Sequence, residues 1–445
     1  MINRNLKKLQ SCGVDIPYQR SMLPTKTFPN HYSIVTGLYP VSHGITANVF
    51  RDLTIGKIFS ATDMRGHETE FWIGEPIWET IQKQGKTAAT YFWPGSDVVI
   101  HDQMPNYWYQ YDDIHSYERR IFQALEWLDI KNSTRPDMII LYFDEPDKHG
   151  HGNGPLSDGA NEEIKRCDDM IGMLMNGLKQ RGIDHCVNIV ISSDHGMSRT
   201  FQDELIMFDE MSDIFDPDKI DNYYTGLGPV ARIGENFNAT EYEIDSVWKD
   251  LKCTRKEKGI NWRAFKKSEN LPRRFHYSDS ERVEDLLFIN DVGASTWLNS
   301  RGDYPNEGDH GYDNLNTEMR ALSIMYGPSL KSGYKTDVPH ENIELYNLFC
   351  ELLNVEPSAN NGTSGSMSHV LRNPVNYPEM AENLVQNLGL QKLKVLLPTH
   401  DLNLEAEWRG NSIEMKLNEV SEYSQILCNN SKMAYLSLQV FFAAM

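Results

Sequence analysis

The sequence predicts an α/β fold in which helices flank a doubly wound sheet, an α/β/α sandwich. Two continuous apolar runs, at residues 138–143 and 187–192, are typical of parallel strands that are buried on both faces. Apolar residues at helical spacing between 164 and 178 predict the helix that connects them. Polar side chains follow both strands directly. Because sites in such sheets collect beyond the carboxyl ends of the strands, these side chains are candidates for function.

Further elements are expected on both sides of this unit. Apolar spacing and stop signals such as Gly13 and Gly37 predict helices, and short apolar runs predict strands. We expect helices at residues 5–13, 27–37, 77–85, 121–128 and 343–353, and strands at 87–92, 285–290 and 295–298. Residues 201–264 show no clear period.

The C-terminal part, residues 377–445, is left as a tail without assignment. Its last apolar run, at 433–445, has about 13 residues, fewer than the roughly 20 that span a bilayer. That run is compatible with a packed helix, a packed strand or the beginning of an anchor. Residues 1–10 are polar and basic and lack the apolar core of a signal peptide.

The composition limits the partners of the chain. A net charge of −20 over 445 residues argues against binding to a nucleic-acid polymer, because such proteins carry a basic stripe. Small anionic substrates would need concentrated local positive charge. Acceptor motifs for N-glycosylation are compatible with a secreted protein, and they lie at Asn132, Asn238, Asn361 and Asn429.

The stretch at residues 25–32 (TKTFPNHY) is typical of a turn that opens a helix. Pro29 suits the first helical turn, and Thr27 precedes it where a hydroxyl normally caps the backbone N–H groups. A hydroxyl there lies at the positive end of the helix dipole, which favours an alkoxide or a phosphate beside it. An ordinary N-cap threonine is the alternative.

Three clusters combine Asp and His in patterns that suit a metal ion. Asp147 and His151 are spaced so that they share one face of a helical turn. Asp194 and His195 follow the second apolar strand, and His310 lies in a glycine-flanked loop. A mixed Asp/His set selects zinc over calcium. Each cluster is a weak signal by itself, but together with Thr27 they predict a metal centre.

These motifs also carry a resemblance. Residues 25–32, 37–45, 145–151, 193–197 and 308–314 resemble, in the same order, motifs of the nucleotide pyrophosphatase/phosphodiesterase (NPP) family of the alkaline phosphatase superfamily. The resemblance extends from about Leu6 to Asn376. Residues 274–277 (RFHY) and the lack of a nuclease-like C-terminal domain resemble the short types four and five. An alkaline-phosphatase-like sheet and a catalytic domain over residues 1–376 are therefore expected.

The resemblance implies residue roles. Thr27 is expected to be the nucleophile, with Asp147, His151 and His310 holding one zinc ion. Asp194 and His195, together with Thr27, are expected to hold a second ion, so that two Zn²⁺ bind per chain. The implied reaction is hydrolysis of a nucleotide phosphodiester or pyrophosphate bond through a phospho-threonine intermediate, which releases a nucleoside 5′-monophosphate.

The resemblance also implies residues that bind the substrate. Asn48 matches the asparagine that donates to a phosphate oxygen, although a turn-forming Asn is the alternative. Phe28 and Tyr111 match the aromatic pair that encloses a nucleobase; otherwise both would be core aromatics.

His43 and His149 are expected to be ordinary loop side chains with satisfied hydrogen bonds.

The chain departs from the family in one respect. Relatives carry another zinc-binding Asp at the end of the first sheet strand, upstream of the nucleophile, and Thr27 lies too near Met1 to allow it. We therefore expect an N-terminally truncated domain whose sheet lacks its first strand, an interior one. Two alternatives stay open: an impaired relative that binds nucleotides or partners, and a mutase or monoesterase of the same superfamily.

The resemblance implies a location and a state of assembly as well. It suggests an extracellular or cell-surface protein that acts as a monomer on small nucleotides. Any attachment to a membrane would depend on segments that this sequence lacks.

Overall fold

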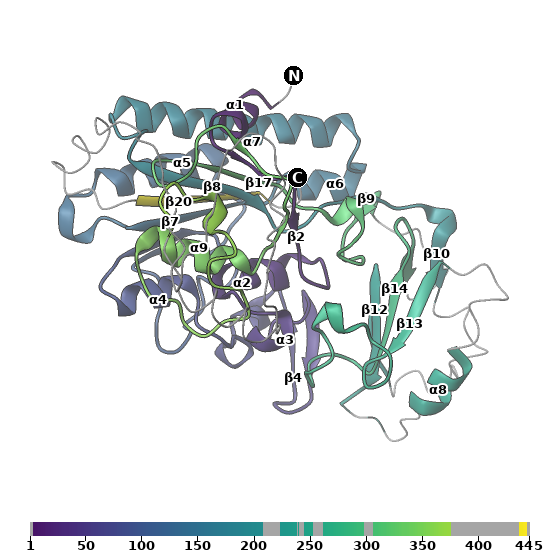
Figure 1. Ribbon diagram of the computed structural model, residues 1–445. Coiled ribbons are helices and arrows are strands. Elements are labelled where there is room, and N and C mark those ends of the chain that lie inside the picture. Colours follow the sequence, from purple (N-terminus) through teal and green to yellow (C-terminus); the bar gives the residue numbers. More distant parts are fainter. Residues whose placement is uncertain are drawn as a thin grey trace, which may run out of the picture. The chain divides into compact units, whose positions relative to one another are not determined.

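The computed structural model describes residues 3–207, 223–237, 239, 244–251, 261–297, 306–374 and 436–442. All of them belong to one unit, Met1–Pro374 with Tyr435–Met445, which is built around an eight-stranded sheet (Figure 1). The strands follow in the order β18 (Tyr334–Lys335), β1 (Val14–Asp15), β17 (Ser323–Tyr326), β8 (Val187–Ser193), β20 (Leu436–Phe442), β7 (Met138–Phe143), β5 (Ala88–Tyr91) and β6 (Tyr107–Tyr109).

The centre of this sheet is parallel. Strands β8, β20, β7, β5 and β6 run in the same direction, whereas β17 is antiparallel to β8. Every residue of β7 and β8 is buried, which agrees with their continuous apolar runs. The predicted α/β class is therefore confirmed.

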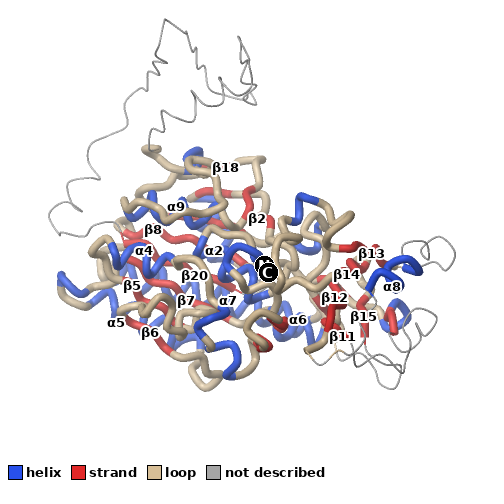
Figure 2. The backbone as a smooth tube through the Cα atoms, turned by 90° about the horizontal axis from the view of Figure 1, so that it is seen from below, coloured by secondary structure: helices blue, strands red, loops and turns tan. Residues whose placement is uncertain are grey.

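Helices cover both faces of the sheet. One layer packs around α7, and it consists of α1 (Arg4–Cys12), α5 (Tyr117–Asp129), α6 (Asp147–Asn153) and α7 (Asp158–Gln180). The other layer consists of α2 (Thr27–Thr36), α3 (Pro40–His43), α4 (Ile77–Lys83) and α9 (Glu344–Leu353) (Figure 2). The predicted helices are all present, with ends shifted by a few residues. Their apolar faces are buried, as Ile121 and Leu128 of α5 illustrate.

The expected gap inside the sheet is filled. Strand β20, from the end of the chain, lies between β7 and β8 and is parallel to both. Val440 is in register with Leu141 of β7 and with Ile191 of β8. The prediction that an interior strand is missing is therefore wrong for this sheet, because the apolar C-terminal run supplies one. Apart from β20, the tail lies outside the described residues.

A second, antiparallel sheet combines strands from the region in which the sequence shows no clear period with β14 (Leu286–Asn290), which was predicted at residues 285–290. It has the order β11 (Tyr223–Gly226), β12 (Val230–Glu235), β14 (Leu286–Asn290) and β13 (Trp262–Lys266), and it packs with α8 (Ile244–Leu251). Buried side chains of this sheet form a hydrophobic cluster with Leu23, which precedes α2. The second sheet thus contacts the loop that leads to Thr27.

Four short two-stranded sheets accompany the two larger sheets among the described residues. They are β2 (Gln19–Arg20) with β19 (His340–Glu341), β3 (Val49–Asp52) with β4 (Lys57–Ser60), β9 (Ser198–Arg199) with β16 (Gly308–Asp309), and β10 (Leu205–Met207) with β15 (Ser295–Trp297). None of the described helices combines the length and apolar character that crossing a membrane requires.

Candidate metal and nucleophile site

Three segments of the chain meet at the carboxyl edge of the main sheet. Strand β7 leads into α6, which carries Asp147 and His151, and β8 leads directly into Asp194 and His195. Strand β16 pairs with β9, which follows β8, and this pairing brings His310 to the same edge. Side chains more than a hundred residues apart thereby become neighbours.

The predicted ligands lie within a few ångströms of one another. His151 Nε2 is 3.5 Å from Asp147 Oδ2, and His310 Nε2 is 3.6 Å from Asp147 Oδ1. The Nε2 atoms of His151 and His310 are 3.1 Å apart. His195 Nε2 is 2.9 Å from Asp194 Oδ2, and its ring stacks on that of His310 with centroids 3.5 Å apart.

Backbone carbonyls orient the three histidines. The Nδ1 atoms of His151, His195 and His310 lie 2.8, 3.0 and 2.7 Å from the carbonyl oxygens of Gly308, Gly196 and Thr25. A carbonyl oxygen can only accept, so each Nδ1 carries a proton, and the Nε2 atoms of His151 and His310 present lone pairs to the cluster. Burial would lower the pKa of His195, but the Asp194 carboxylate beside its Nε2 raises that pKa.

Two observations show that these residues suit a cation. Lone pairs of two imidazoles at 3.1 Å repel each other unless a proton or a metal lies between them. Asp147 Oδ1 is buried and accepts no hydrogen bond. Two overlapping groups of three residues each offer ligand atoms that lie within 4.8 Å of one another. One group is Asp147, His195 and His310, and the other is His151, Asp309 and His310. Imidazole and carboxylate donors of this kind suit zinc.

The same crowding shifts the pKa values of the ligands. Burial raises the pKa of Asp147. Burial would also raise the pKa of Asp194, but His195 and His31 beside it hold that pKa below its usual range. Burial lowers the pKa of His310, and the neighbouring His195 and Lys26 lower it further. A neutral imidazole of this kind is the form that binds a metal.

Thr27 lies beside this cluster. It is the first residue of α2, and Lys26 occupies the N-cap position without a side-chain cap. The N-cap prediction for Thr27 is therefore wrong by one residue, because the helix already begins at Thr27. Thr27 Oγ1 is 3.4 Å from His195 Nε2. Helix α2 ends as predicted at Gly37, whose φ of 67° is left-handed.

Asn48 is held next to Thr27 by the backbone. Its Oδ1 accepts a hydrogen bond of 3.0 Å from the backbone N–H of Phe28. This contact fixes the amide orientation and leaves the Nδ2 hydrogens available as donors. The side chain is half-buried, and its contact with Phe28 places it beside the residue that follows Thr27.

The two predicted aromatic residues stand apart. Phe28 packs against Phe59 and Trp72, with ring centroids 5.9 and 6.3 Å away. Tyr111 is 44% exposed, and its ring contacts that of Phe92 at 5.2 Å. The rings of Phe28 and Tyr111 do not contact each other among the described ring pairs. Their role as a pair that encloses a base stays a prediction.

The two histidines expected to be ordinary differ in environment. His43 is fully buried, and its ring contacts Ser33, the Pro29 carbonyl and the Ile45 amide, so its hydrogen bonds are satisfied as predicted, although it is the last residue of α3 rather than a loop residue. His149 lies on α6 rather than in a loop, and its Nδ1 is 2.8 Å from Glu145 Oε1.

Sequence reasoning missed three residues of this site. His31, one turn after Thr27, is buried with its Nδ1 2.8 Å from the Thr27 carbonyl and 3.3 Å from Asp194 Oδ2. Asp309 lies in ligand range of His151 and His310. Lys26 forms an ion pair with Asp309 at 2.7 Å. All three lie inside the motifs at residues 25–32 and 308–314, and their place in these motifs was the signal that could have identified them.

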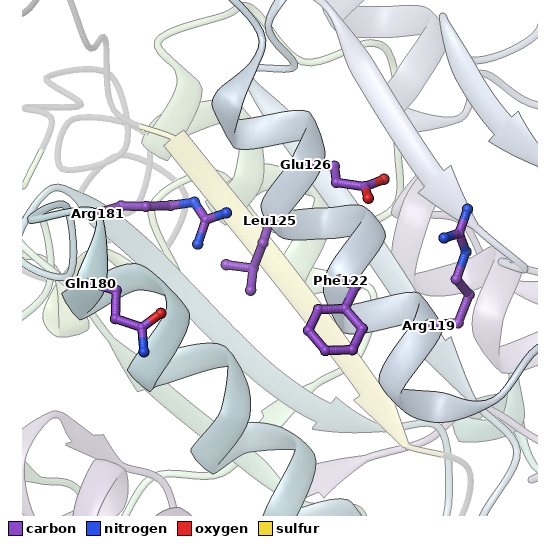
Figure 3. A pocket seen from close by; sticks show the side chains of 6 residues that line it. All are labelled: Arg119, Phe122, Leu125, Glu126, Gln180 and Arg181. Carbon is purple, nitrogen blue, oxygen red and sulfur yellow. The ribbon is translucent and has the colours of Figure 1, made fainter.

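A cavity also lies elsewhere in the fold, on the surface formed by α5 and α7. It measures about 430 Å³, and none of the predicted site residues lines it (Figure 3). Its lining consists of Arg119, Phe122, Leu125, Glu126, Gln180 and Arg181. The metal and nucleophile cluster is therefore separate from this cavity.

Comparison with known proteins identifies the family. The sequence model described as type I phosphodiesterase / nucleotide pyrophosphatase matches residues 2–313, which include every predicted site residue. The chain belongs to this family. Bovine (Bos taurus) ectonucleotide pyrophosphatase/phosphodiesterase family member 3 is 38% identical over 427 residues, which cover 95% of this chain and 47% of that protein.

Other members of the family give the same result. A venom phosphodiesterase of Macrovipera lebetinus is 39% identical over 86% of this chain and 44% of its own length. The solved structure of human ectonucleotide pyrophosphatase/phosphodiesterase 5 superimposes with a TM-score of 0.76 and 30% identity, covering 83% of this chain and 95% of that one. The chain thus spans about half the length of the curated relatives it matches. These comparisons confirm the predicted NPP fold.

Proposed function

We propose that this chain hydrolyses nucleotide phosphodiester or pyrophosphate bonds and releases nucleoside 5′-monophosphates. The observation that carries the proposal is the position of Thr27 Oγ1, 3.4 Å from His195 Nε2 at the edge of an Asp/His cluster. Membership of the phosphodiesterase / nucleotide pyrophosphatase family supports the same reaction class. The names of relatives, ectonucleotide enzymes and venom phosphodiesterases, support an extracellular or cell-surface location.

The proposed cofactor is zinc, with two ions per chain. Asp147, His151 and His310 would hold one ion, and Asp194 and His195 the other. When bound, a pair of such ions lowers the pKa of a nucleophilic hydroxyl and stabilises charge on attacking and leaving oxygens. The histidines face the cluster through Nε2 because backbone carbonyls hold their Nδ1 protons, so the donors are arranged before any ion arrives.

Thr27 is the proposed nucleophile. Its Oγ1 forms a bond to phosphorus while the bond from phosphorus to the leaving oxygen breaks, and water later releases the phosphoryl group from Thr27. Asn48 donates from Nδ2 to a non-bridging oxygen, since its Oδ1 is already engaged by Phe28 N–H. Phe28 and the exposed Tyr111 offer faces for a nucleobase, and stacking contributes roughly 1–3 kcal/mol per base.

Replacing Thr27 tests this proposal. Thr27→Ala removes the nucleophilic oxygen and should abolish release of nucleoside monophosphate, whereas Thr27→Ser keeps a hydroxyl and should retain part of the activity. Initial rates with a dinucleotide substrate measure both, and circular dichroism checks that the variants fold. Undiminished turnover by Thr27→Ala would reject the role of this residue.

Two further measurements separate the alternatives. Zinc content of the purified chain should be two ions per molecule, and a chain that binds none would be an impaired relative. Rates with a phosphodiester should exceed those with the corresponding phosphomonoester. Faster turnover of the monoester would instead favour a mutase or monoesterase of the superfamily.

A further inference from the structure

A lysine ammonium enters the candidate metal site directly before the nucleophile. Lys26 Nζ is 2.7 Å from Asp309 Oδ1, and the backbone N–H of His310 donates to the same oxygen at 2.7 Å. The two side chains are only 22% and 4% exposed. This ion pair is therefore mostly shielded from water, and its charges interact more strongly than those of a surface pair.

Asp309 lies where it can reach a metal ion. One carboxylate oxygen of Asp309 and one ring nitrogen each of His151 and His310 are all within 4.8 Å of one another. A carboxylate is an acceptable ligand for zinc and a preferred one for harder cations such as Mg²⁺ and Mn²⁺. An ammonium has no lone pair and cannot be a ligand itself, but its charge competes with a cation for the carboxylate.

The fold leaves room for this lysine. Gly311, one residue after His310, has a φ of 126°, and a Cβ at this position would lie 2.7 Å from Lys26 Cε. A side chain at 311 would therefore require the lysine stem to shift, and the backbone angle would strain it. The absence of a side chain at Gly311 leaves the Lys26 stem in its place beside Asp309.

We propose that Lys26 is a positioning residue that withholds the Asp309 carboxylate from the metal held by His151 and His310. This inference rests on the proposed metal site and adds a control over the number and charge of its ligands. With Asp309 bound to Lys26, imidazole donors predominate and the site favours zinc. Without the ammonium, a further carboxylate becomes available and harder cations gain affinity.

A double-mutant cycle in the full chain tests the proposal. Lys26→Met keeps an unbranched apolar stem but removes the charge, and Asp309→Asn removes the charge of the carboxylate. Affinities for Zn²⁺ and Mn²⁺ are measured by competition with a chelator. Lys26→Met should raise the affinity for Mn²⁺ relative to Zn²⁺ by roughly 10- to 100-fold, the usual size of effects from residues behind the ligands.

The matched variants decide the cause. Asp309→Asn alone should not raise the affinity for Mn²⁺ relative to Zn²⁺, and the Lys26→Met/Asp309→Asn pair should return to the metal preference of the unaltered chain. Lys26→Arg keeps the charge and serves as control. The inference is wrong if Lys26→Met and the double variant show the same preference, or if Lys26→Met changes nothing.

Zn²⁺ affinity also decides whether Asp309 is itself a ligand. A fall shared by Asp309→Asn and the Lys26→Met/Asp309→Asn pair, in which no unpaired ammonium remains, would mean that Asp309 is already a ligand and would overturn the inference. A different result, no zinc binding by the unaltered chain, would overturn the proposed metal site and this inference with it. The two failures are thus distinguishable.

Discussion

Individual side chains at this site are held by backbone atoms more than by each other. The histidines that face the cluster each donate through Nδ1 to a carbonyl oxygen, and Asn48 accepts from a backbone amide. Such contacts form as soon as the chain folds, so the donors need little reorganisation when a ligand binds. Preorganisation of this kind is what a phosphoryl-transfer site requires.

His43, by contrast, is a buried histidine whose role is structural. Burial lowers the pKa of His43 to about 3, and the charge of the nearby Arg282 lowers it further. The unfolded chain therefore binds this proton below roughly pH 6.5, whereas the folded chain does not. The free energy of unfolding should fall as the pH decreases through this range.

Urea unfolding of the chain and of His43→Gln measures this effect. Between about pH 7 and about pH 5, the loss of stability should be smaller in His43→Gln by about 2 kcal/mol, as proton linkage for such a pKa shift predicts. Comparing the pH dependence rather than the absolute stability removes the packing cost of the substitution. Equal losses in the two proteins would show that His43 is not buried in its neutral form.

Among the elements, β20 has the greatest consequence for the site. It lies between β7 and β8, and Phe442 is in register with Phe143 and with Ser193, at the ends from which the two ligand segments emerge. Neighbouring strands are about 4.8 Å apart, so β20 sets the separation of β7 and β8. The geometry of the metal cluster therefore depends on a strand from the far end of the chain.

A proline in β20 tests this dependence. Val440→Pro removes a backbone donor from an interior strand and should destabilise the fold by about 1–3 kcal/mol, whereas Val440→Thr keeps the donor and a β-branched side chain. Thermal unfolding compares the two variants. In the unaltered chain, hydrogen exchange of residues 436–442 should be as slow as that of β7 and β8, and fast exchange would contradict the pairing.

For the molecule as a whole, the ligand cluster joins segments that are far apart in the sequence. Helix α6, the end of β8 and the loop after β16 meet at the edge of the main sheet, where β16 contacts α6 and pairs with β9. An ion that binds there stabilises the folded state alone, since the unfolded chain does not bring these residues together. The net charge of −20 adds a general preference for bound cations.

Removing metal should therefore lower the stability of the entire unit. At a free zinc concentration of about 100 times Kd, each site contributes about 2.7 kcal/mol, and a chelator should abolish this gain. Thermal midpoints with and without chelator measure the difference. In Asp147→Asn, the difference between the thermal midpoints with and without chelator should be smaller. Equal midpoints with and without chelator in the unaltered chain would mean that the stability of the unit does not depend on zinc.

The sequence alone determined the features that depend on neighbouring residues in the chain. Strands β7 and β8, helices α5 and α7 and the Asp147/His151 turn follow from local periodicity, and the motifs indicated the family. Only the tertiary structure decided which distant segments pair. The place of β20 and the Lys26–Asp309 ion pair depend on contacts between residues hundreds of positions apart, and the second sheet pairs β12 with β14, which are not consecutive strands. No local pattern encodes such contacts, because each is chosen by the packing of the whole fold.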